Sequence, residues 1–500
     1  MTTDAGAALL RQSPGLSVAS SRGRWLLGVV VLGTSLIAVD GTVVRLALPA
    51  IGTDLHADFS TLQWIVTAYT WTLASVILIG GAAGDRYGRR RIFLMGVVWF
   101  SGASLLCAAA PDAAWLVTGR VLQGVGAALL APASMAVLQA SYRPSERARA
   151  IGAWVGLSGL AGTAAPFLAG WLLDAGSWRW VFLISPLLSG PAVVMTLRHM
   201  PETRDAAAPR HLDLPGALLG LIALGALTYA TIATAGHPVV SPSVLSPAVV
   251  SVLAFLAFWA WERRARQPML PPAWFRSRQF TATNAVTVLV YGAINGFLFL
   301  VLIEFQVVAG FSALVAGAAF LPSTALTLLL SSRSGRVAAR IGPRVPLSVG
   351  PLVCAAGILL SLRVGPGAGY LGDVVPAVAI FGLGLVITIP PLNASVLASV
   401  SEAHSGLASG VNNAVACAAG LLTVAALPAI VGLTGGRYTH PAQSLPAFRS
   451  GLLLCASAMV AGAVLAVFTV RNAAHVPTGA RQRPGPDRRT PDVPPEMRST

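Results

Sequence analysis

Long apolar segments separated by clusters of arginine run through the whole chain, and they constrain its fold more than any other feature. Fourteen such segments lie at about 25–51, 62–84, 92–110, 113–139, 148–173, 180–198, 215–236, 245–262, 281–307, 312–332, 346–363, 373–398, 405–433 and 449–470. An α-helix needs roughly 20 apolar residues to cross a bilayer. Only 10% of the 500 residues are charged, whereas a soluble domain carries roughly a quarter. The sequence therefore predicts an all-α integral membrane protein with fourteen transmembrane helices.

The distribution of arginine predicts the orientation of these helices. The chain has no lysine, so all 34 basic residues are arginine. Most of them lie in the N-terminal segment, in alternate loops and in the tail, whereas the opposite loops hold only Arg179, Arg363, Arg437 and Arg449. The positive-inside rule then predicts a multi-pass protein of the cell membrane with both termini in the cytoplasm. Because the arginines alternate with apolar segments, the net charge of +16 reflects topology, and we expect no nucleic-acid partner.

Several classes of function are disfavoured by the residues that the spans lack. A Walker-type phosphate loop requires a lysine, so uphill transport by this chain must use an ion gradient or a partner subunit. The four cysteines lie in apolar segments and are typical of small core residues. The seven histidines lie in loops, tails or segment ends. We therefore expect no enzymatic activity, no metal site and no cofactor, with the proton gradient as the energy source.

A ten-residue repeat indicates that the chain has two related halves. GAAGDRYGRR at 81–90 reappears as GRVAARIGPR at 335–344, and secondary transporters are commonly built from two repeats with the substrate site between them. The predicted organisation is a cytoplasmic N-terminal segment (1–24), an N-terminal six-helix bundle (25–198), a linker with two inserted helices (199–280), a C-terminal six-helix bundle (281–470) and a disordered cytoplasmic tail (471–500).

Charged side chains within predicted spans are costly and usually functional. Asp40 lies well inside the first span, where burial disfavours the ionised carboxylate, so it can carry a proton or neutralise a cation but not both together. Arg120 in the fourth span can favour or release that charge as helices move. A structural ion pair between Asp40 and Arg120 is the alternative, and both roles can coexist. Glu304, near the outer end of the ninth span, is either a second proton or substrate site or an interfacial residue in contact with water.

Arg45 follows Asp40 by five residues, which places it about 140° round the helix. The two side chains therefore do not share a face. We expect Arg45 to extend to the outer surface, with a substrate-facing role as the alternative.

Two further patterns concern the loops and the helix contacts. In the 81–90 loop, Asp85 lies at a helix end and can bind arginines or a helix N-terminus across the interface between the halves, which would latch one conformation. The second copy has Ala339 at that position, so the latch is one-sided. Small residues predict close helix packing, and a proline predicts a bend in the fifth span; these packing positions are Gly124, Gly126, Gly152, Pro166 and Gly170.

Together these segments resemble the major facilitator superfamily, and specifically its fourteen-helix drug:proton antiporters, over residues from about 24 to 470. The first repeat is similar to the superfamily's loop signature at Gly81, Asp85, Arg86, Gly88, Arg89 and Arg90. RVLQGVGAA is similar to the fourth-helix motif at Arg120, Gln123, Gly124 and Gly126. AVDGTVVRLALP resembles the first-helix motif of the fourteen-helix exporters at Asp40, Thr42, Val43, Val44 and Pro49. The fifth span matches its motif only loosely, because alanines replace glycines at 161, 165 and 169.

The resemblance implies two pseudo-symmetric bundles plus two extra helices, alternating access, and antiport of protons through Asp40 with the assistance of Arg120. The expected substrate is a hydrophobic drug, antibiotic or secondary metabolite, exported by a protein that functions as a monomer. Arg45 and Gln123 are the candidate substrate-selectivity residues. Arg45 replaces the family's usual asparagine, and its charge favours neutral or anionic substrates over cations. The alternative function is a proton-linked importer or facilitator of a small metabolite on the same fold.

Overall fold

The computed structural model describes residues 15–204, 213–265, 268–270, 272–400, 405–433 and 441–472, and these are almost entirely helical. The first six helices are α1 (Ser21–Asp54), α2 (Phe59–Tyr87), α3 (Arg89–Ala108), α4 (Ala113–Ser141), α5 (Pro144–Ala175) and α6 (Arg179–His199). They are followed by α7 (Leu214–Ala233) and α8 (Pro242–Arg264). The remaining helices are α9 (Arg278–Val307), α10 (Ala313–Ala318), α11 (Leu321–Ile341), α12 (Arg344–Leu360), α13 (Val375–Ala398), α14 (Ser405–Val431) and α15 (Pro441–Thr469).

Every predicted span corresponds to helix. Thirteen helical segments of the described chain are long and apolar enough to cross a membrane, and α5, at the fifth predicted span, is a helix of 32 residues. The tenth span consists of the short α10 and the following α11, which meet at residues 319–320. The predicted class, an all-α integral membrane protein, is confirmed.

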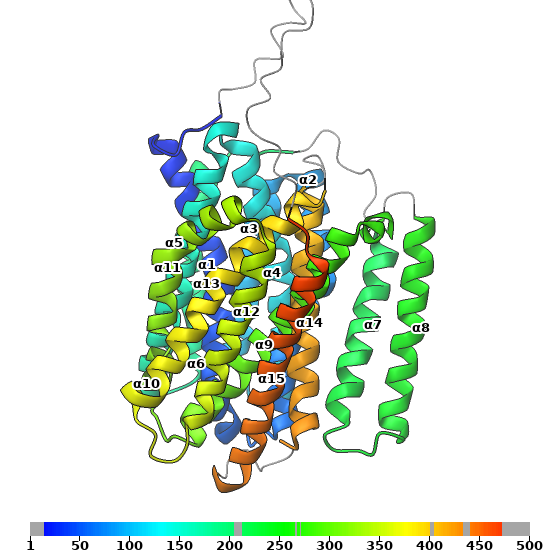
Figure 1. Ribbon diagram of the computed structural model, residues 1–500. Helices are drawn as coiled ribbons and strands as arrows, with labels where there is room; N and C mark the ends of the chain where they lie inside the picture. The colour runs from blue at the N-terminus through cyan, green and yellow to red at the C-terminus, as the bar shows by residue number, and fades with distance from the viewer. Residues whose placement is uncertain are drawn as a thin grey trace, which may run out of the picture.

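The two extra helices lie beside the rest of the bundle, as Figure 1 shows for α7 and α8. Only α7 packs closely against the other helices, mainly α2 and α14. The indole nitrogen of Trp71 on α2 donates to the carbonyl of Leu221 at 2.9 Å. Gly225 lies directly against the Trp71 ring, where a Cβ atom would come within 2.6 Å. The inserted pair is therefore attached through one helix and leaves the other twelve spans together.

The sequence repeat is also a structural repeat. Gly88 ends α2 with a φ of 113°, and Gly342 ends α11 with a φ of 84°. These glycines occupy equivalent positions of the two ten-residue copies. Glycine adopts positive φ without the steric cost that a Cβ atom imposes. Each half therefore turns from its second to its third helix by the same backbone device.

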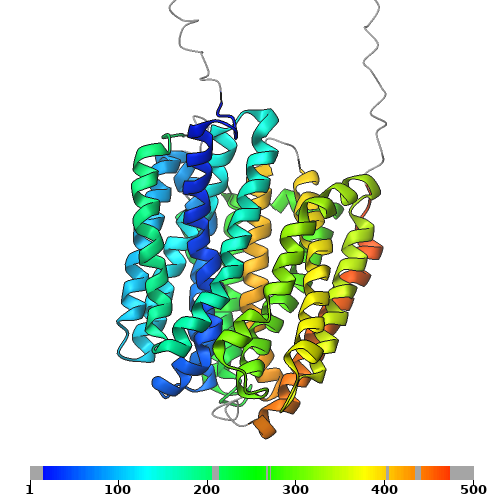
Figure 2. The same ribbon diagram turned by 90° about the vertical axis from the view of Figure 1, so that its left-hand side faces the viewer.

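The ends of the bundle differ in how the halves meet, and Figure 2 shows the two halves side by side. We call the end that carries the loops at 86–91, 143–149 and 333–344 the arginine-rich end. At the opposite end, one continuous apolar cluster includes Val44 and Phe59 from the first half together with Phe299 and Phe305 from α9. At the arginine-rich end, the larger of two separate clusters is formed almost wholly by the first half and the smaller by α9, α13 and α14. The apolar seal between the halves is therefore at the opposite end.

Polar contacts reinforce this seal. The Gln63 amide nitrogen on α2 donates to the carbonyls of Val424 and Ala425 on α14, both at 2.9 Å. The Gln306 amide nitrogen on α9 donates to the carbonyl of Leu46 on α1 at 3.1 Å. An amide that bonds a carbonyl of the other half fixes helix register as well as distance. The opposite end is closed by contacts of both kinds.

The small residues of α5 divide along the helix in the same way. Gly170, near the opposite end, lies against the backbone of Leu314 on α10, where a Cβ atom would overlap. A Cβ atom on Gly152 or Gly156, towards the arginine-rich end, would meet no described atom within 4 Å. In this conformation, Gly170 has the predicted close contact, whereas Gly152 has no neighbour within 4 Å. The side chain of Pro166 lies outside the described part.

The segment before α1 is partly ordered. The backbone nitrogen of Leu16 donates to the carbonyl of Ser141 at 2.8 Å. The Val18 N–H and the Ser17 hydroxyl both donate to the Glu146 carboxylate at the start of α5, and these bonds lower the pKa of Glu146. The expected N-terminal segment therefore contacts the first half from residue 15 onward, whereas the expected disordered tail lies outside the described residues beyond Asn472.

Candidate functional site

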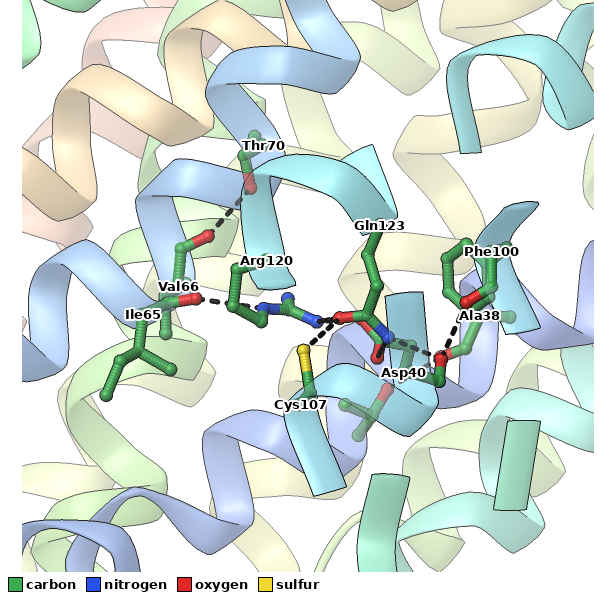
Figure 3. A network of polar contacts seen from close by, with 11 residues as sticks. Ala38, Asp40, Ile65, Val66, Thr70, Phe100, Cys107, Arg120 and Gln123 are labelled. Atoms are coloured by element: carbon green, nitrogen blue, oxygen red, sulfur yellow. Dashed lines mark hydrogen bonds and ion pairs between the residues drawn. The ribbon is translucent and has the colours of Figure 1, made fainter. Parts of the chain in front are cut away.

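A buried ion pair joins α1 and α4 in the first half (Figure 3). A guanidinium nitrogen of Arg120, Nη1, lies 2.6 Å from Oδ2 of Asp40. The two residues are 2% and 4% exposed. Removing either partner would leave an uncompensated charge away from water, which typically costs about 3–5 kcal/mol. The sequence placed both residues within spans, and the structure brings them into direct contact.

Gln123 completes the surroundings of this pair. Its amide nitrogen donates to Oδ1 of Asp40 at 3.2 Å and to the Ser104 hydroxyl at 2.6 Å. Its amide oxygen accepts from Nη1 of Arg120 at 2.6 Å. Gln123 is fully buried, and its described contacts hold the ion pair, because three residues along α4 put it on the same face as Arg120. The selectivity role expected for Gln123 remains a prediction.

Helix α2 contacts the other side of the Arg120 guanidinium. Nε of Arg120 donates to the carbonyl of Ile65 at 3.0 Å (Figure 3). The guanidinium carbon lies 4.5 Å from the centre of the Tyr69 ring, a cation–π distance. The Arg120 side chain is thus fixed by α1, α2 and its own helix. Movement among these helices would change the surroundings of Asp40.

The glycines that follow Arg120 allow this arrangement. A Cβ atom on Gly124 would lie 2.5 Å from the carbonyl oxygen of Tyr69 on α2. A Cβ atom on Gly126 would lie 2.7 Å from the backbone nitrogen of Phe100 on α3. Close backbone approach of this kind needs residues without a side chain. Both glycines thus lie at close helix contacts, where the sequence predicts them.

A cavity of about 30 Å³, close to the volume of one water molecule, adjoins the pair. It lies between α1, α2 and α4 and is lined by Gly41, Val44, Arg45, Val66, Tyr69, Thr70 and Arg120. The Arg120 guanidinium therefore has contact with a space that the buried Asp40 carboxylate itself does not line. This space could admit water to the Arg120 side of the pair.

Arg45 connects the two halves. Its Nη2 donates to the amide oxygen of Asn295 on α9 at 2.7 Å, while its Nε is buried without a hydrogen-bond partner among the described residues. The expectation that Arg45 extends to the outer surface is wrong. The helical angle separates Arg45 from Asp40, as predicted, but the face on which it lies meets α9 and not solvent.

Glu304 is fully buried, and neither carboxylate oxygen has a hydrogen-bond partner within the described chain. The alternative of an interfacial residue in contact with water is therefore wrong. Glu304 follows Leu300 by one helical turn, and Leu300 lies against Gly451 on α15. Arg449 is also on α15, but no ion pair joins it to Glu304 in the described part. The structure does not link Glu304 to the Asp40–Arg120 pair.

The 81–90 loop is held within the first half. Nη2 of Arg89 lies 2.7 Å from Oδ1 of Asp85. The backbone nitrogen of Arg90 donates to the Glu202 carboxylate at 3.2 Å, and Nε of Arg91 lies 3.8 Å from it. The expected latch requires Asp85 to contact the other half. The described contacts of Asp85 do not cross to that half.

The remaining signature residues of this loop take separate positions. Gly81 lies beside Pro132 on α4, where a Cβ atom would be in ordinary contact at 3.4 Å. Arg86 stacks over the Tyr87 ring at 5.0 Å. A Cβ atom on Gly88 would come within 2.5 Å of the Glu202 carboxylate. The signature thus shapes a tight turn against an acid that follows α6.

Sequence reasoning did not single out Glu202, Ser104 or Asn295. Glu202 carried a usable signal, because it is an acid in a segment otherwise rich in arginine (198–210). Ser104 and Asn295 carried none, since single uncharged polar residues are common within membrane helices. No cluster of three or more metal-ligating side chains occurs among the described residues.

Comparisons with known proteins agree with this architecture. The family model described as Major Facilitator Superfamily matches residues 30–424. The chain is 36% identical to the puromycin resistance protein pur8 of Streptomyces alboniger, over 81% of this chain and 80% of that protein. It is 32% identical to the tetracenomycin C resistance and export protein of Streptomyces glaucescens, over 81% and 76%. A solved POT family transporter in complex with a thioalcohol conjugated peptide matches with a TM-score of 0.65 at 15% identity, over 89% and 96%, a likeness of fold alone.

Proposed function

This chain belongs to the Major Facilitator Superfamily, and we propose that it is a proton-coupled antiporter that exports a hydrophobic small molecule from the cytoplasm. It is a multi-pass membrane transporter related to drug and antibiotic resistance exporters, and not an enzyme. As in that family generally, transport needs no cofactor. The names of the relatives make puromycin and tetracenomycin C the first substrates to test.

The buried Asp40–Arg120 pair is the observation that carries the proton coupling. Arginine stays charged at physiological pH, so Asp40 is the partner that can change its state. A proton on Asp40 would cancel the attraction to Arg120 and weaken its bond from Gln123, which donates to the same carboxylate. Each state of Asp40 therefore favours a different arrangement of α1, α2 and α4. Such exclusive states are what antiport requires.

Alternating access is supported by the different ends of the bundle. The arginine-rich end should face the cytoplasm by the positive-inside rule, which would put the apolar seal at the extracellular end, as an inward-open conformation requires. Arg45 lies on the same helix as Asp40 and bonds to Asn295 across the interface. A shift of α1 on protonation would thus reach the contact between the halves. We propose that the two six-helix halves (25–198 and 281–470) move in this way within a monomer.

Glu304 is proposed as a second protonatable site. It is a carboxyl group with no compensating partner in the described chain, and a charged form would be strongly disfavoured there. The charge of Arg45 at the interface favours neutral or anionic substrates, because a cation would be repelled at the same place.

The direct test is drug export by a sensitive host that expresses the chain. We expect resistance to puromycin or tetracenomycin C and energy-dependent efflux that is lost when an ionophore collapses the proton gradient. Expression of the Asp40→Asn variant at the same level is the control. Accumulation of the drug in the expressing cells would contradict export and support an importer. A reporter fused after Arg471 that is active only outside the cell would contradict the orientation.

A further inference from the structure

A groove opens between α11 and α12 at the arginine-rich end. Its volume is about 300 Å³, and α13 forms its floor. The lining residues are Leu330, Arg333, Ser334, Val337, Ile341, Val345, Pro346, Val349, Leu383, Val386 and Ile387. Because α11 packs chiefly on α13, and α12 on α13 and α15, the mouth of the groove faces away from the centre of the second half.

The groove combines apolar walls with one guanidinium. Val337 and Val345, on its two walls, are 51% and 49% exposed. In a membrane protein such exposed aliphatic surface faces lipid chains. Arg333 is also exposed and lies among these side chains. An apolar channel beside a fixed cation is suited to a molecule that has a hydrocarbon chain and an anionic head.

The matching helices of the first half pack closely at the aligned position. In the aligned repeat, Gly80 and Ile79 take the positions of Ser334 and Arg333. Gly80 lies against the backbone of Ala128, so that a Cβ atom would overlap and α2 and α4 are in direct contact. A serine at the equivalent position cannot approach as closely. The spacing of α11 and α13 at Ser334 is therefore not imposed by the repeat.

The arginines around the groove also lack acidic partners. Arg333, Arg340 and Arg344 form no ion pair within the described chain, whereas Arg89 and Arg91 at the matching end of the first half pair with Asp85 and Glu202. The sequence from 305 to 372 contains no aspartate or glutamate. The positive charge at this groove is thus left for an anion from outside the chain.

We propose that this groove binds an anionic phospholipid of the cytoplasmic leaflet, with the head-group phosphate near Arg333 and an acyl chain along Leu330, Val349 and Leu383, which lie further from the arginine-rich end. Arg333 lies eight residues before the end of α11, about 12 Å along the helix. A long arginine side chain covers part of this depth by extending towards the head groups. Basic pockets between transmembrane helices on the cytoplasmic side are suited to anionic head groups. The proposal rests on the proposed function only for the identity of the leaflet.

The experiment uses the full-length protein, purified in detergent and stripped of lipid. Phosphatidylglycerol is titrated while thermal unfolding is followed, with phosphatidylcholine and inorganic phosphate as comparison probes. We expect phosphatidylglycerol to raise the unfolding temperature more than either probe. Arg333→Gln should weaken this binding about fivefold, the effect of one arginine near an anionic surface. Leu383→Phe, which fills the floor and keeps every charge, should weaken it as well.

Arg264→Gln serves as the matched control, because Arg264 is an exposed arginine at the end of α8 that does not line the groove. It should bind phosphatidylglycerol like the wild type. Equal binding of phosphatidylcholine, an equal effect of inorganic phosphate, or wild-type affinity in Arg333→Gln would overturn the proposal. Since no transport is measured, failure of this test would leave the proposed export untouched, and failure of export would leave the lipid site untouched.

Discussion

The two halves of the molecule contain the same repeat but differ in whether their charged side chains form ion pairs. All four ion pairs of the described chain join residues between 40 and 202. In the second half, Glu304 is buried without a partner, and the arginines of the second repeat form no described ion pair. The first half therefore compensates its buried carboxylate Asp40 with Arg120, whereas the buried carboxyl group of the second half, Glu304, has no such partner.

This difference indicates a division of labour. Loss of the charge on one partner of a buried ion pair has a large energetic cost. The helices around Asp40 can therefore have two distinct arrangements, one for each charge state of the carboxyl group. A titratable side chain without a partner, such as Glu304, has no second arrangement of this kind. Its state depends on the proton or ligand that binds it. We infer that the first half holds the coupling switch and that the second half supplies additional binding groups.

The largest expected effect comes from breaking the buried pair. Arg120→Gln removes the charge opposite Asp40, and we expect the free energy of unfolding to fall by about 3–5 kcal/mol, with loss of transport. Thermal unfolding of the purified variant measures this. The control is Arg179→Gln, which breaks the exposed pair with Asp54, 2.8 Å long, and should cost at most about 1 kcal/mol. Equal effects of the two variants would remove the distinction between buried and exposed pairs.

The matching change in the second half is Glu304→Gln. No partner is lost, so the free energy of unfolding should change by less than about 1 kcal/mol or increase, because a neutral amide is easier to bury. Gradient-driven accumulation should fall, though less than in Asp40→Asn. Vesicle transport and thermal unfolding are measured on the same preparation. Strong destabilisation would show that Glu304 has a structural partner, and unchanged accumulation would exclude it as a proton site.

A smaller effect is expected at the 81–90 loop. Asp85→Asn removes the ion pair with Arg89 but leaves the spans and the arginines of the loop intact. Transport should be impaired several-fold while membrane insertion stays at the wild-type level, as judged by the amount of protein in the membrane fraction. Wild-type efflux would mean that the acid of this loop has no part in the conformational change.

The smallest effect concerns selectivity. Arg45→Asn removes a positive charge at the interface but keeps a side chain that can bond across it. We expect the ratio of cation to anion export to rise by a few-fold, with the total rate largely retained. Efflux of a matched pair of cationic and anionic dyes measures this ratio. An unchanged ratio would show that Arg45 serves only to join α1 and α9.

The spans and the repeat could be predicted from the sequence because both are local patterns of apolar and basic residues. The positions of Asp40 and Arg120 followed from the cost of burying charge. The partner of Arg45 could not be predicted, since Asn295 is 250 positions away and a helical angle does not identify the neighbouring helix. The close contact predicted at Gly152 is not found for another reason. Small residues permit close packing, but the conformation decides whether a neighbour is present.

The most direct test of the coupling switch is transport by Asp40→Asn in inside-out vesicles, with and without an imposed pH gradient. The asparagine keeps the shape of the side chain and loses the titratable group, so the protein should still fold, although the unpaired Arg120 lowers its stability by about 3–5 kcal/mol. We expect accumulation by the wild type to rise with the gradient and that by the variant to be insensitive to it. A membrane potential of 100 mV contributes about 2.3 kcal/mol per charge moved, so the loss of one coupled proton is measurable. If the variant responds to the gradient like the wild type, Asp40 is not the coupling site and the switch does not lie in the first half.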